Sequence, residues 1–359
     1  MAIDFSSYRM EAVKESHSRF WEGSLDRPLV SITMHGPYEP DPDKYHGAPL
    51  LSQANCHDLS ISAEDIVGRM GEWLSTLTFL GDAYPMINMD AFGPGVLAAF
   101  CGAELDNRSG RVWFFPGESF KGKDISEIHA KYDPDNVYAR RIKDIYKAGR
   151  NAFGDQVVFG MPDLGGNLDV AAVFRGTENL LIDLYDEPDE VQRLTLEIEQ
   201  AWHEAYLDFS SVMSPGAFSD WAGLLSRTPS YILQCDFSYM IGNEMYDRFV
   251  LPGIVRDTEK LDHTMYHLDG IGALKHLERL LNIPGLDAVQ WVPGEGQPGP
   301  MHWLDVYSKI RSAGKRMMLI GSPEDFVNVS RVMGGKDFYY QVHISHNDTA
   351  CAEALLQIR

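Results

Sequence analysis

The sequence alternates short apolar runs, rich in β-branched and aromatic residues, with longer segments that have helical periodicity. Strands that alternate with helices need crossover connections, and strands joined in this way form a parallel sheet. Eight runs follow residue 84, and an earlier candidate strand covers residues 29–34. We therefore predict an α/β fold, a single closed (β/α)8 TIM barrel, with a doubly wound open sheet as the alternative. The eight runs are residues 85–89, 157–161, 217–221, 231–235, 264–268, 287–292, 316–320 and 338–342.

Helix-length segments lie between these runs, and their ends carry the signals expected of helices. Asp189 and Glu190 follow Pro188 at the start of the longest segment, where the helix dipole favours acidic side chains. Ser322 precedes Pro323, which is typical of a cap followed by proline at the first helical position. The predicted helices include residues 189–210, 243–260, 274–281, 303–313 and 323–332.

No stretch has the composition of a linker, so the chain is expected to form one barrel with an addition at its beginning. Residues 1–80 are predicted to form an N-terminal extension packed on the barrel, and residues 81–359 to form the barrel itself.

The charge of the chain excludes several classes of partner. With 31 Lys and Arg against 52 Asp and Glu, the formal net charge is −21, which argues against binding to nucleic acid or to an anionic membrane surface. No apolar run approaches the roughly 18 residues that span a bilayer, and the first residues do not resemble a signal peptide. The four cysteines have no paired spacing, so we expect a cytoplasmic protein.

Titratable or aromatic residues lie at the ends of most predicted strands. In a (β/α)8 barrel the chemistry takes place at the C-terminal ends of the strands, so these positions predict a site there. The residues in or just after the strands are Asp90, Asp163, Trp221, Asp236, His267, Asp269, Trp291, Glu295, Gly321 and His343.

The most specific pattern among these residues is His267 followed by Asp269. Residues i and i+2 of a strand point to the same side, so these two side chains are expected to converge. Imidazole and carboxylate groups at strand ends are suitable ligands for Zn²⁺, with His343 on the last strand as a third. The alternative is a pair of hydrogen-bonded histidines without a metal. Cys235 is more typical of a buried apolar position than of a ligand.

Four segments, in this order, resemble the uroporphyrinogen decarboxylase superfamily, specifically its corrinoid-linked (cobamide-dependent) methyltransferase branch. They are DAFGPGVLAA at residues 90–99, FRGTENLL at 174–181, NEMYDRFVLP at 243–252 and the H-x-D-G segment at 267–270. The resemblance implies a (β/α)8 barrel, a zinc site and a corrinoid carried by a partner protein.

Two departures from the family pattern refine what the resemblance implies. The arginine-rich segment that binds an acidic tetrapyrrole is replaced by residues 27–36, which makes a porphyrinogen an unsuitable substrate. Asp269 and His343 stand where zinc-binding members have cysteines, and His267 keeps the family's histidine. Nitrogen and oxygen ligands leave Zn²⁺ a stronger Lewis acid, which favours an oxygen or nitrogen leaving group over activation of a thiol.

The first functional hypothesis is a zinc-dependent methyltransferase. It would move a methyl group between a small O- or N-methylated substrate, or a thiol or folate acceptor, and a corrinoid protein. The predicted metal ligands are His267, Asp269 and His343. The predicted acid–base residues are Asp236, Glu295 and Asp90, and the predicted substrate-binding residues are Trp221, Trp291 and Tyr266.

Two other hypotheses stay open on the sequence. The first is a metal-free decarboxylase or lyase of uroporphyrinogen decarboxylase type, in which Asp90, Asp236 and His267 act as acid–base groups on a non-porphyrin substrate. The second is a barrel without catalytic activity, whose cleft binds a ligand or a corrinoid protein.

Overall fold

A seven-stranded sheet forms the centre of the computed structural model, which describes residues 3–359. The strand order is β2-β1-β11-β10-β9-β8-β7, and every neighbouring pair is parallel except β1 with β2. The predicted α/β fold with a mostly parallel sheet is therefore confirmed. The strands are β1 (Leu29–His35), β2 (Thr78–Gly81), β7 (Ser230–Gln234), β8 (His263–Asp269), β9 (Ala288–Val292), β10 (Arg316–Leu319) and β11 (Phe338–Ser345).

The predicted closed barrel is not present as one hydrogen-bonded sheet within residues 3–359. Strand β3 (Met86–Ile87) pairs in parallel with β6 (Val158–Phe159), and β4 (Glu104–Asp106) pairs antiparallel with β5 (Trp113–Phe115). Among the hydrogen bonds that join the segment after β6 to the loop at 217–226 and to β7, Met161 N donates to Ser219 O over 2.7 Å and Leu164 N donates to the Tyr231 hydroxyl over 2.8 Å.

One predicted strand, residues 217–221, does not join a sheet. This segment turns back on itself, and Phe218 forms a single antiparallel bridge with Ser226. Side chains hold the returning part of this loop: the Trp21 indole donates to Leu225 O and the Tyr339 hydroxyl to Gly223 O. Because these bonds replace a strand ladder, the segment packs as a buried loop against the central sheet.

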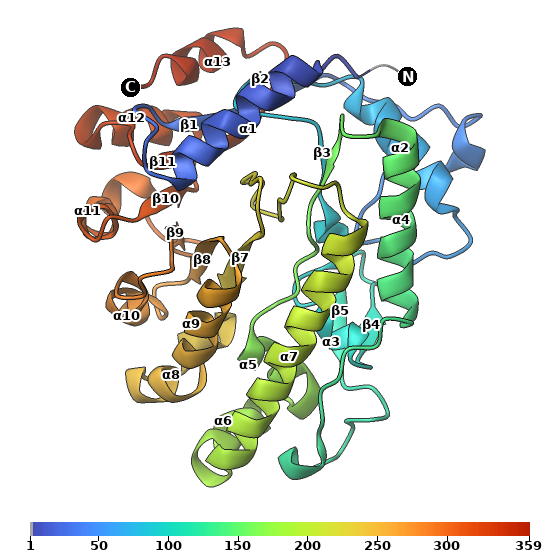
Figure 1. The fold of residues 1–359 in the computed structure, drawn as a ribbon, viewed down its shortest axis with the longest axis vertical. Helices are drawn as coiled ribbons and strands as arrows, with labels where there is room; N and C mark the ends of the chain where they lie inside the picture. The colour runs from blue at the N-terminus through green and yellow to red at the C-terminus, as the bar shows by residue number, and fades with distance from the viewer. Residues whose placement is uncertain (1–2) are drawn as a thin grey trace.

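Helices follow the strands and lie outside them, and Figure 1 shows α8 to α12 arranged around strands β7 to β11. The predicted helix over residues 243–260 is divided between α8 and α9, because Pro252 has no N–H to continue the first helix. The helices are α1 (Ser7–Trp21), α2 (Ala63–Leu74), α3 (Leu97–Phe100), α4 (Val137–Phe153), α5 (Asn167–Arg175), α6 (Thr177–Asp186), α7 (Pro188–Val212), α8 (Asn243–Phe249), α9 (Leu251–Lys260), α10 (Leu277–Leu281), α11 (Leu304–Ser312), α12 (Pro323–Met333) and α13 (Thr349–Leu356).

The predicted helix starts agree with the structure. Helix α7 begins at Pro188, and α12 begins at Pro323 with Ser322 as its cap, whose hydroxyl accepts from Asp325 N over 3.2 Å. Across residues 3–359, none of the helices combines the length with the apolar character needed to cross a bilayer.

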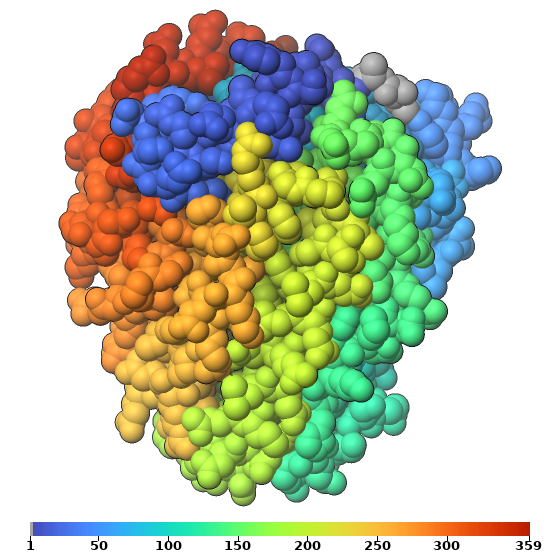
Figure 2. All heavy atoms as spheres, in the orientation of Figure 1, coloured from blue at the N-terminus to red at the C-terminus, as the bar shows by residue number. Residues whose placement is uncertain are grey.

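The first 80 residues are part of the central sheet as well as its covering. Strand β1 lies between β2 and β11, so this segment places two strands in the sheet. Figure 2 shows the N-terminal residues packed against the C-terminal part of the chain. The division into residues 1–80 and 81–359 stays a prediction.

His17 of α1 makes stability depend on pH. The ring is wholly buried, with Nδ1 accepting from Leu225 N over 3.0 Å and Nε2 facing Asp82 O at 3.1 Å. Burial lowers the pKa of His17 from 6.5 to about 4. The unfolded chain takes up a proton on this imidazole at a higher pH than the folded chain does. The contribution of the neutral, buried ring to stability is therefore complete above pH 6.5 and is lost as the pH falls from 6.5 to 4. Its full size is about 3 kcal/mol.

We expect His17→Gln to remove this part of the pH dependence. The measurement is urea unfolding of both proteins between pH 7 and pH 4. The carboxyl groups titrate in the same way in the two proteins, so the difference between them reports on His17. As the pH falls, the free energy of unfolding should decrease more steeply in the native protein than in the variant. The difference in slope should correspond to the uptake of up to one additional proton on unfolding. Equal slopes in the two proteins would contradict this role of His17.

Candidate active site

Three side chains that can bind a metal meet at the C-terminal ends of β7 and β8. They are His267 and Asp269 of β8 and Asp236, which follows β7 after Cys235. One ligand atom of each lies within 4.8 Å of the others. The grouping follows from the sheet, because β7 and β8 are neighbours with Gln234 opposite His267.

A glutamine on the next strand fixes the orientation of His267. Gln290 lies opposite His267 in the β8–β9 pairing, and its Oε1 contacts His267 Nδ1 in a short hydrogen bond. The Gln290 amide nitrogen in turn lies 2.9 Å from Met318 Sδ. Because Oε1 only accepts, Nδ1 carries the proton and Nε2 keeps a free lone pair. Burial lowers the pKa of His267, so the ring is held in the neutral form that binds metals.

A carboxylate on α5 holds the turn that carries Asp236. Asp169 accepts from Phe237 N over 2.7 Å, from Asp236 N over 3.0 Å and from Gly166 N over 3.2 Å. Desolvation by the surrounding protein and the charge of Asp269 raise the pKa of Asp236 to about 6. The clustered carboxylates therefore repel each other, and a cation between them would relieve that repulsion.

The other predicted acid–base residues, Asp90 and Glu295, are not members of this three-residue cluster. Asp90 is solvent-accessible in the turn after β3, and partial desolvation raises its pKa. Glu295 is exposed in the loop after β9. Asp163, which follows β6, is buried and accepts from Gly165 N and from the Gln234 amide, both over 2.9 Å. Burial raises the pKa of Asp163 to about 7.

A cavity of about 280 Å³ adjoins the cluster through Trp221. The Trp221 ring lies on its wall and packs edge to face on the His267 imidazole, with ring centroids 5.1 Å apart. The lining contains no Lys, Arg, Asp or Glu among the described residues. It consists of Ser31, Thr33, Leu51, Met70, Trp73, Leu74, Leu77, Phe79, Ala83, Tyr84, Met86, Asn88, Trp221, Gly223, Gln341 and His343.

His343, the third predicted ligand, lines this cavity and is not in the three-residue cluster. Its strand β11 is separated from β8 by β10 and β9, whereas β7 is next to β8. Strand order therefore places Asp236, and not His343, beside His267 and Asp269. Desolvation, together with the neighbouring His35, lowers the pKa of His343. Cys235 is buried, and burial raises the pKa of its thiol.

Of the three predicted substrate-binding residues, Trp221 lines the cavity and the other two lie within the packed interior. Tyr266 is wholly buried next to His267 in the strand, and its side chain points to the opposite face because successive residues alternate. Trp291 of β9 packs edge to face on Trp303, beside α11, at 5.4 Å. Neither Tyr266 nor Trp291 is among the described residues that line the cavity.

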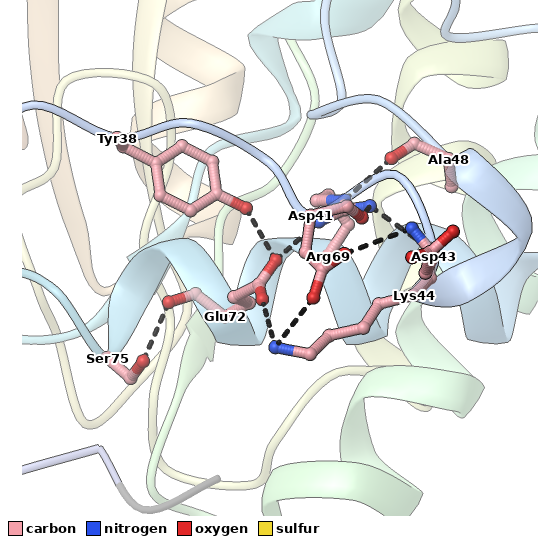
Figure 3. A network of polar contacts seen from close by, with 8 residues as sticks. All are labelled: Tyr38, Asp41, Asp43, Lys44, Ala48, Arg69, Glu72 and Ser75. Atoms are coloured by element: carbon pink, nitrogen blue, oxygen red, sulfur yellow. Dashed lines mark hydrogen bonds and ion pairs between the residues drawn. The ribbon is translucent and has the colours of Figure 1, made fainter.

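Helix α2 and the loop before it form a part of the cavity wall that the sequence did not predict. Sequence reasoning assigned this segment to a covering extension, so Trp73 and Leu51 carried no signal of function. Arg69 of α2, wholly buried, holds the loop by donating to Asp41 O over 2.6 Å, to Ala48 O over 2.7 Å and to Lys44 O over 3.0 Å. Figure 3 shows these bonds converging on one guanidinium group.

A second group of possible ligands lies away from the cavity, between α7 and α9. Glu199, His203 and Asp257 each place one ligand atom within 4.8 Å of the others. Arg256 already engages both oxygens of Glu199, with Nε at 2.8 and 3.0 Å. Because a protein cation occupies this carboxylate, the group is better described as a partly buried ion-pair network.

The chain resembles known proteins in its structure and not in its sequence. No protein family model matches the chain, and no curated protein matches its sequence. Among solved structures, the chain is similar to a methyltransferase from Methanosarcina mazei, with a TM-score of 0.57 and 13% sequence identity. The match covers 96% of this chain and 98% of that one. At this identity the likeness shows a common fold.

Proposed function

We propose that the protein is a zinc-dependent methyltransferase of the uroporphyrinogen decarboxylase superfamily, in its corrinoid-linked branch. It would transfer a methyl group between a small O- or N-methylated substrate and a corrinoid protein. The main support is the contact between Trp221 and His267, which joins a cluster of metal ligands to a cavity of substrate size. The similarity in fold to a methyltransferase is consistent with this proposal.

The same proposal includes the form of the fold. We regard the central sheet, the β3–β6 pair and the loop at 217–226 as one distorted (β/α)8 barrel. The pairing of the first strand β1 with the last strand β11 supports this, as does the bond from Met161 N to Ser219 O.

The three clustered side chains fit a zinc ion. His267 would bind it through the free Nε2, and Asp269 and Asp236 through carboxylate oxygens, which leaves an open position as in catalytic zinc sites. Zinc bound there would act as a Lewis acid on the leaving atom of the substrate. This donor set differs from the predicted one by the exchange of His343 for Asp236.

The side chains around the cluster have separate roles in this proposal. Gln290 holds the His267 ring in one tautomer, and Asp169 holds the turn that carries Asp236. The cavity orients the substrate, with His343 and Trp221 on its wall. In demethylation the bond between the methyl carbon and oxygen or nitrogen would break with the electron pair staying on the heteroatom, and the methyl group would pass to the reduced corrinoid that a partner protein would supply. Glu295 and Asp90 stay candidate proton donors.

The test combines metal analysis with an assay of methyl transfer. The purified protein should contain about one zinc per chain, as expected for a single catalytic site. Cob(I)alamin replaces the corrinoid protein, and methoxybenzene and tetramethylammonium serve as donors, with the cobalt absorbance recorded over time. Removal of the metal by a chelator should abolish transfer, and Zn²⁺ should restore it. A metal-free protein with undiminished transfer would refute the zinc mechanism.

The raised pKa of Asp236, about 6, favours a second candidate, a metal-free decarboxylase or lyase acting on a non-porphyrin substrate. A carboxyl group that titrates near neutral pH can act as a general acid. In that case chelation would leave activity unchanged, and Asp236→Asn would abolish it.

A further inference from the structure

One of the three clustered side chains lies outside the sheet, on the turn Asp236–Met240. Strand β7 ends at Gln234, so strand pairing does not fix the position of Asp236 as it fixes His267 and Asp269 in β8. The carboxylates of Asp236 and Asp269 repel each other when both are ionised. The separation of Asp236 from the two side chains of β8 therefore depends on what holds the turn in place.

The ring of Tyr239, in this turn, packs on the backbone that follows β8. A Cβ atom at Gly272 would lie 2.6 Å from Cε2 of the ring, and one at Gly270 would lie 2.8 Å from Cδ2. Non-bonded carbon atoms pack at about 3.5–4.0 Å, so the ring fills the space that a side chain at either glycine would need. Because Gly270 directly follows Asp269, this contact joins the turn of one carboxylate to the strand end of the other.

Two hydrogen bonds hold the same turn from the same side. His276 Nε2 donates to Ser238 O over 3.0 Å, and Lys275 Nζ donates to Tyr239 O over 3.2 Å. His276 is wholly buried and stacks on the ring of Tyr246 with centroids 4.1 Å apart, which makes it a firm anchor. With Asp169 on α5 holding the opposite side, the turn is fixed between α5 and the segment after β8.

Tyr239 contributes to this arrangement without being part of the packed interior. Its side chain is 49% exposed, whereas the aromatic residues of the core are buried. Loss of the ring should therefore leave the fold intact and alter the turn locally.

We propose that Tyr239 is a positioning residue of the metal site, which sets the separation between the Asp236 and Asp269 carboxylates. This inference rests on the metal site of the proposed function and is independent of methyl transfer. With the turn held in place, the ion does not have to draw Asp236 toward β8, and it binds more tightly for that reason.

Titration of the full chain with Zn²⁺ and with Co²⁺, after treatment with a chelator, tests this inference. Tyr239→Ala should weaken Zn²⁺ binding by about 10–100-fold. It should also change the visible absorption of bound Co²⁺, which depends on coordination geometry. Tyr239→Phe keeps the ring and should match the native protein in both measurements. Unchanged zinc affinity or unchanged Co²⁺ absorption in Tyr239→Ala would overturn the inference.

A substitution on the other side of the contact gives an independent test. Gly272 is outside the left-handed backbone region, so Gly272→Ala should displace the ring without straining the backbone, and should weaken zinc binding as Tyr239→Ala does. The double variant should bind no more weakly than Tyr239→Ala, because both changes remove one contact. Additive losses would contradict the inference. Tyr185→Ala, at an exposed tyrosine of α6, is the matched control and should bind zinc as the native protein does.

The outcomes also separate this inference from the proposed function. A native protein that binds zinc but transfers no methyl group would refute the methyltransferase and keep the role of Tyr239. Methyl transfer by a zinc-containing native protein, with unchanged zinc affinity in Tyr239→Ala, would keep the methyltransferase and refute the role of Tyr239. A native protein that binds no zinc would overturn both.

Discussion

His267→Ala is expected to reduce zinc binding more than any other single change in the protein. The variant loses the one nitrogen ligand of the cluster and leaves Asp236 and Asp269 facing each other without a bound cation. We expect the zinc affinity to fall by well over about a hundredfold, because changes to groups that only orient ligands already cost about 10–100-fold. Metal content after dialysis, measured by atomic absorption, gives the result, and methyl transfer should be lost with the metal.

Two further variants make the test specific. Gln290→Ala keeps all three ligands but removes the acceptor for His267 Nδ1, and should weaken zinc binding by about 10–100-fold. His203→Ala changes the partly buried network between α7 and α9 and should leave the zinc content unchanged. If zinc were retained in His267→Ala and lost in His203→Ala, the metal would belong to the second group and the proposed site would be wrong.

Arg69→Met is expected to have the largest effect on the wall of the cavity. The substitution keeps an apolar stem but leaves three backbone carbonyls, of Asp41, Lys44 and Ala48, without their donor. At about 1 kcal/mol or more for each, we expect a loss of about 3 kcal/mol in the free energy of unfolding. Since Leu51 lies in the same loop and on the cavity wall, ligand binding should weaken as well.

Limited proteolysis measures this effect directly. The segment from Tyr38 to Leu51 should become the first site of cleavage in Arg69→Met, whereas the native protein should resist at that position. Lys44→Met is the control, because the Lys44 side chain is about half exposed and its ion pair with Glu72 is therefore partly screened by solvent. Cleavage at the same rate in both variants would contradict the role given to Arg69.

Local sequence patterns were sufficient to predict the elements of this fold. The alternation of apolar runs with helical segments predicted every strand from β7 to β11, because buried parallel strands require continuous apolar residues. The start of α12 followed from Ser322 and Pro323, whose capping chemistry is local. Residues 217–221 failed as a strand because the chain turns back after them. Phe218 bridges to Ser226, and bonds from Trp21 and Tyr339, far away in sequence, hold Leu225 and Gly223 in the returning part of the loop.

Local sequence patterns also predicted part of the candidate site. His267 and Asp269 lie two residues apart in one strand, so their convergence follows from strand geometry alone. Gln290 was missed because an amide in the middle of a strand has no sequence signal for a role beside a histidine. Its position opposite His267 comes from the register of β8 with β9.

The sequence by itself therefore determined the fold class, the edge of the sheet at which the candidate site lies, and two members of the cluster. These depend on periodicity and on spacing within one element, which are properties of neighbouring residues. Only the tertiary structure decided that Asp236 joins the cluster while His343 lines the cavity, and that α2 supplies part of the wall. Those outcomes depend on the order of strands in the sheet and on contacts between distant segments, which spacing along the chain does not encode.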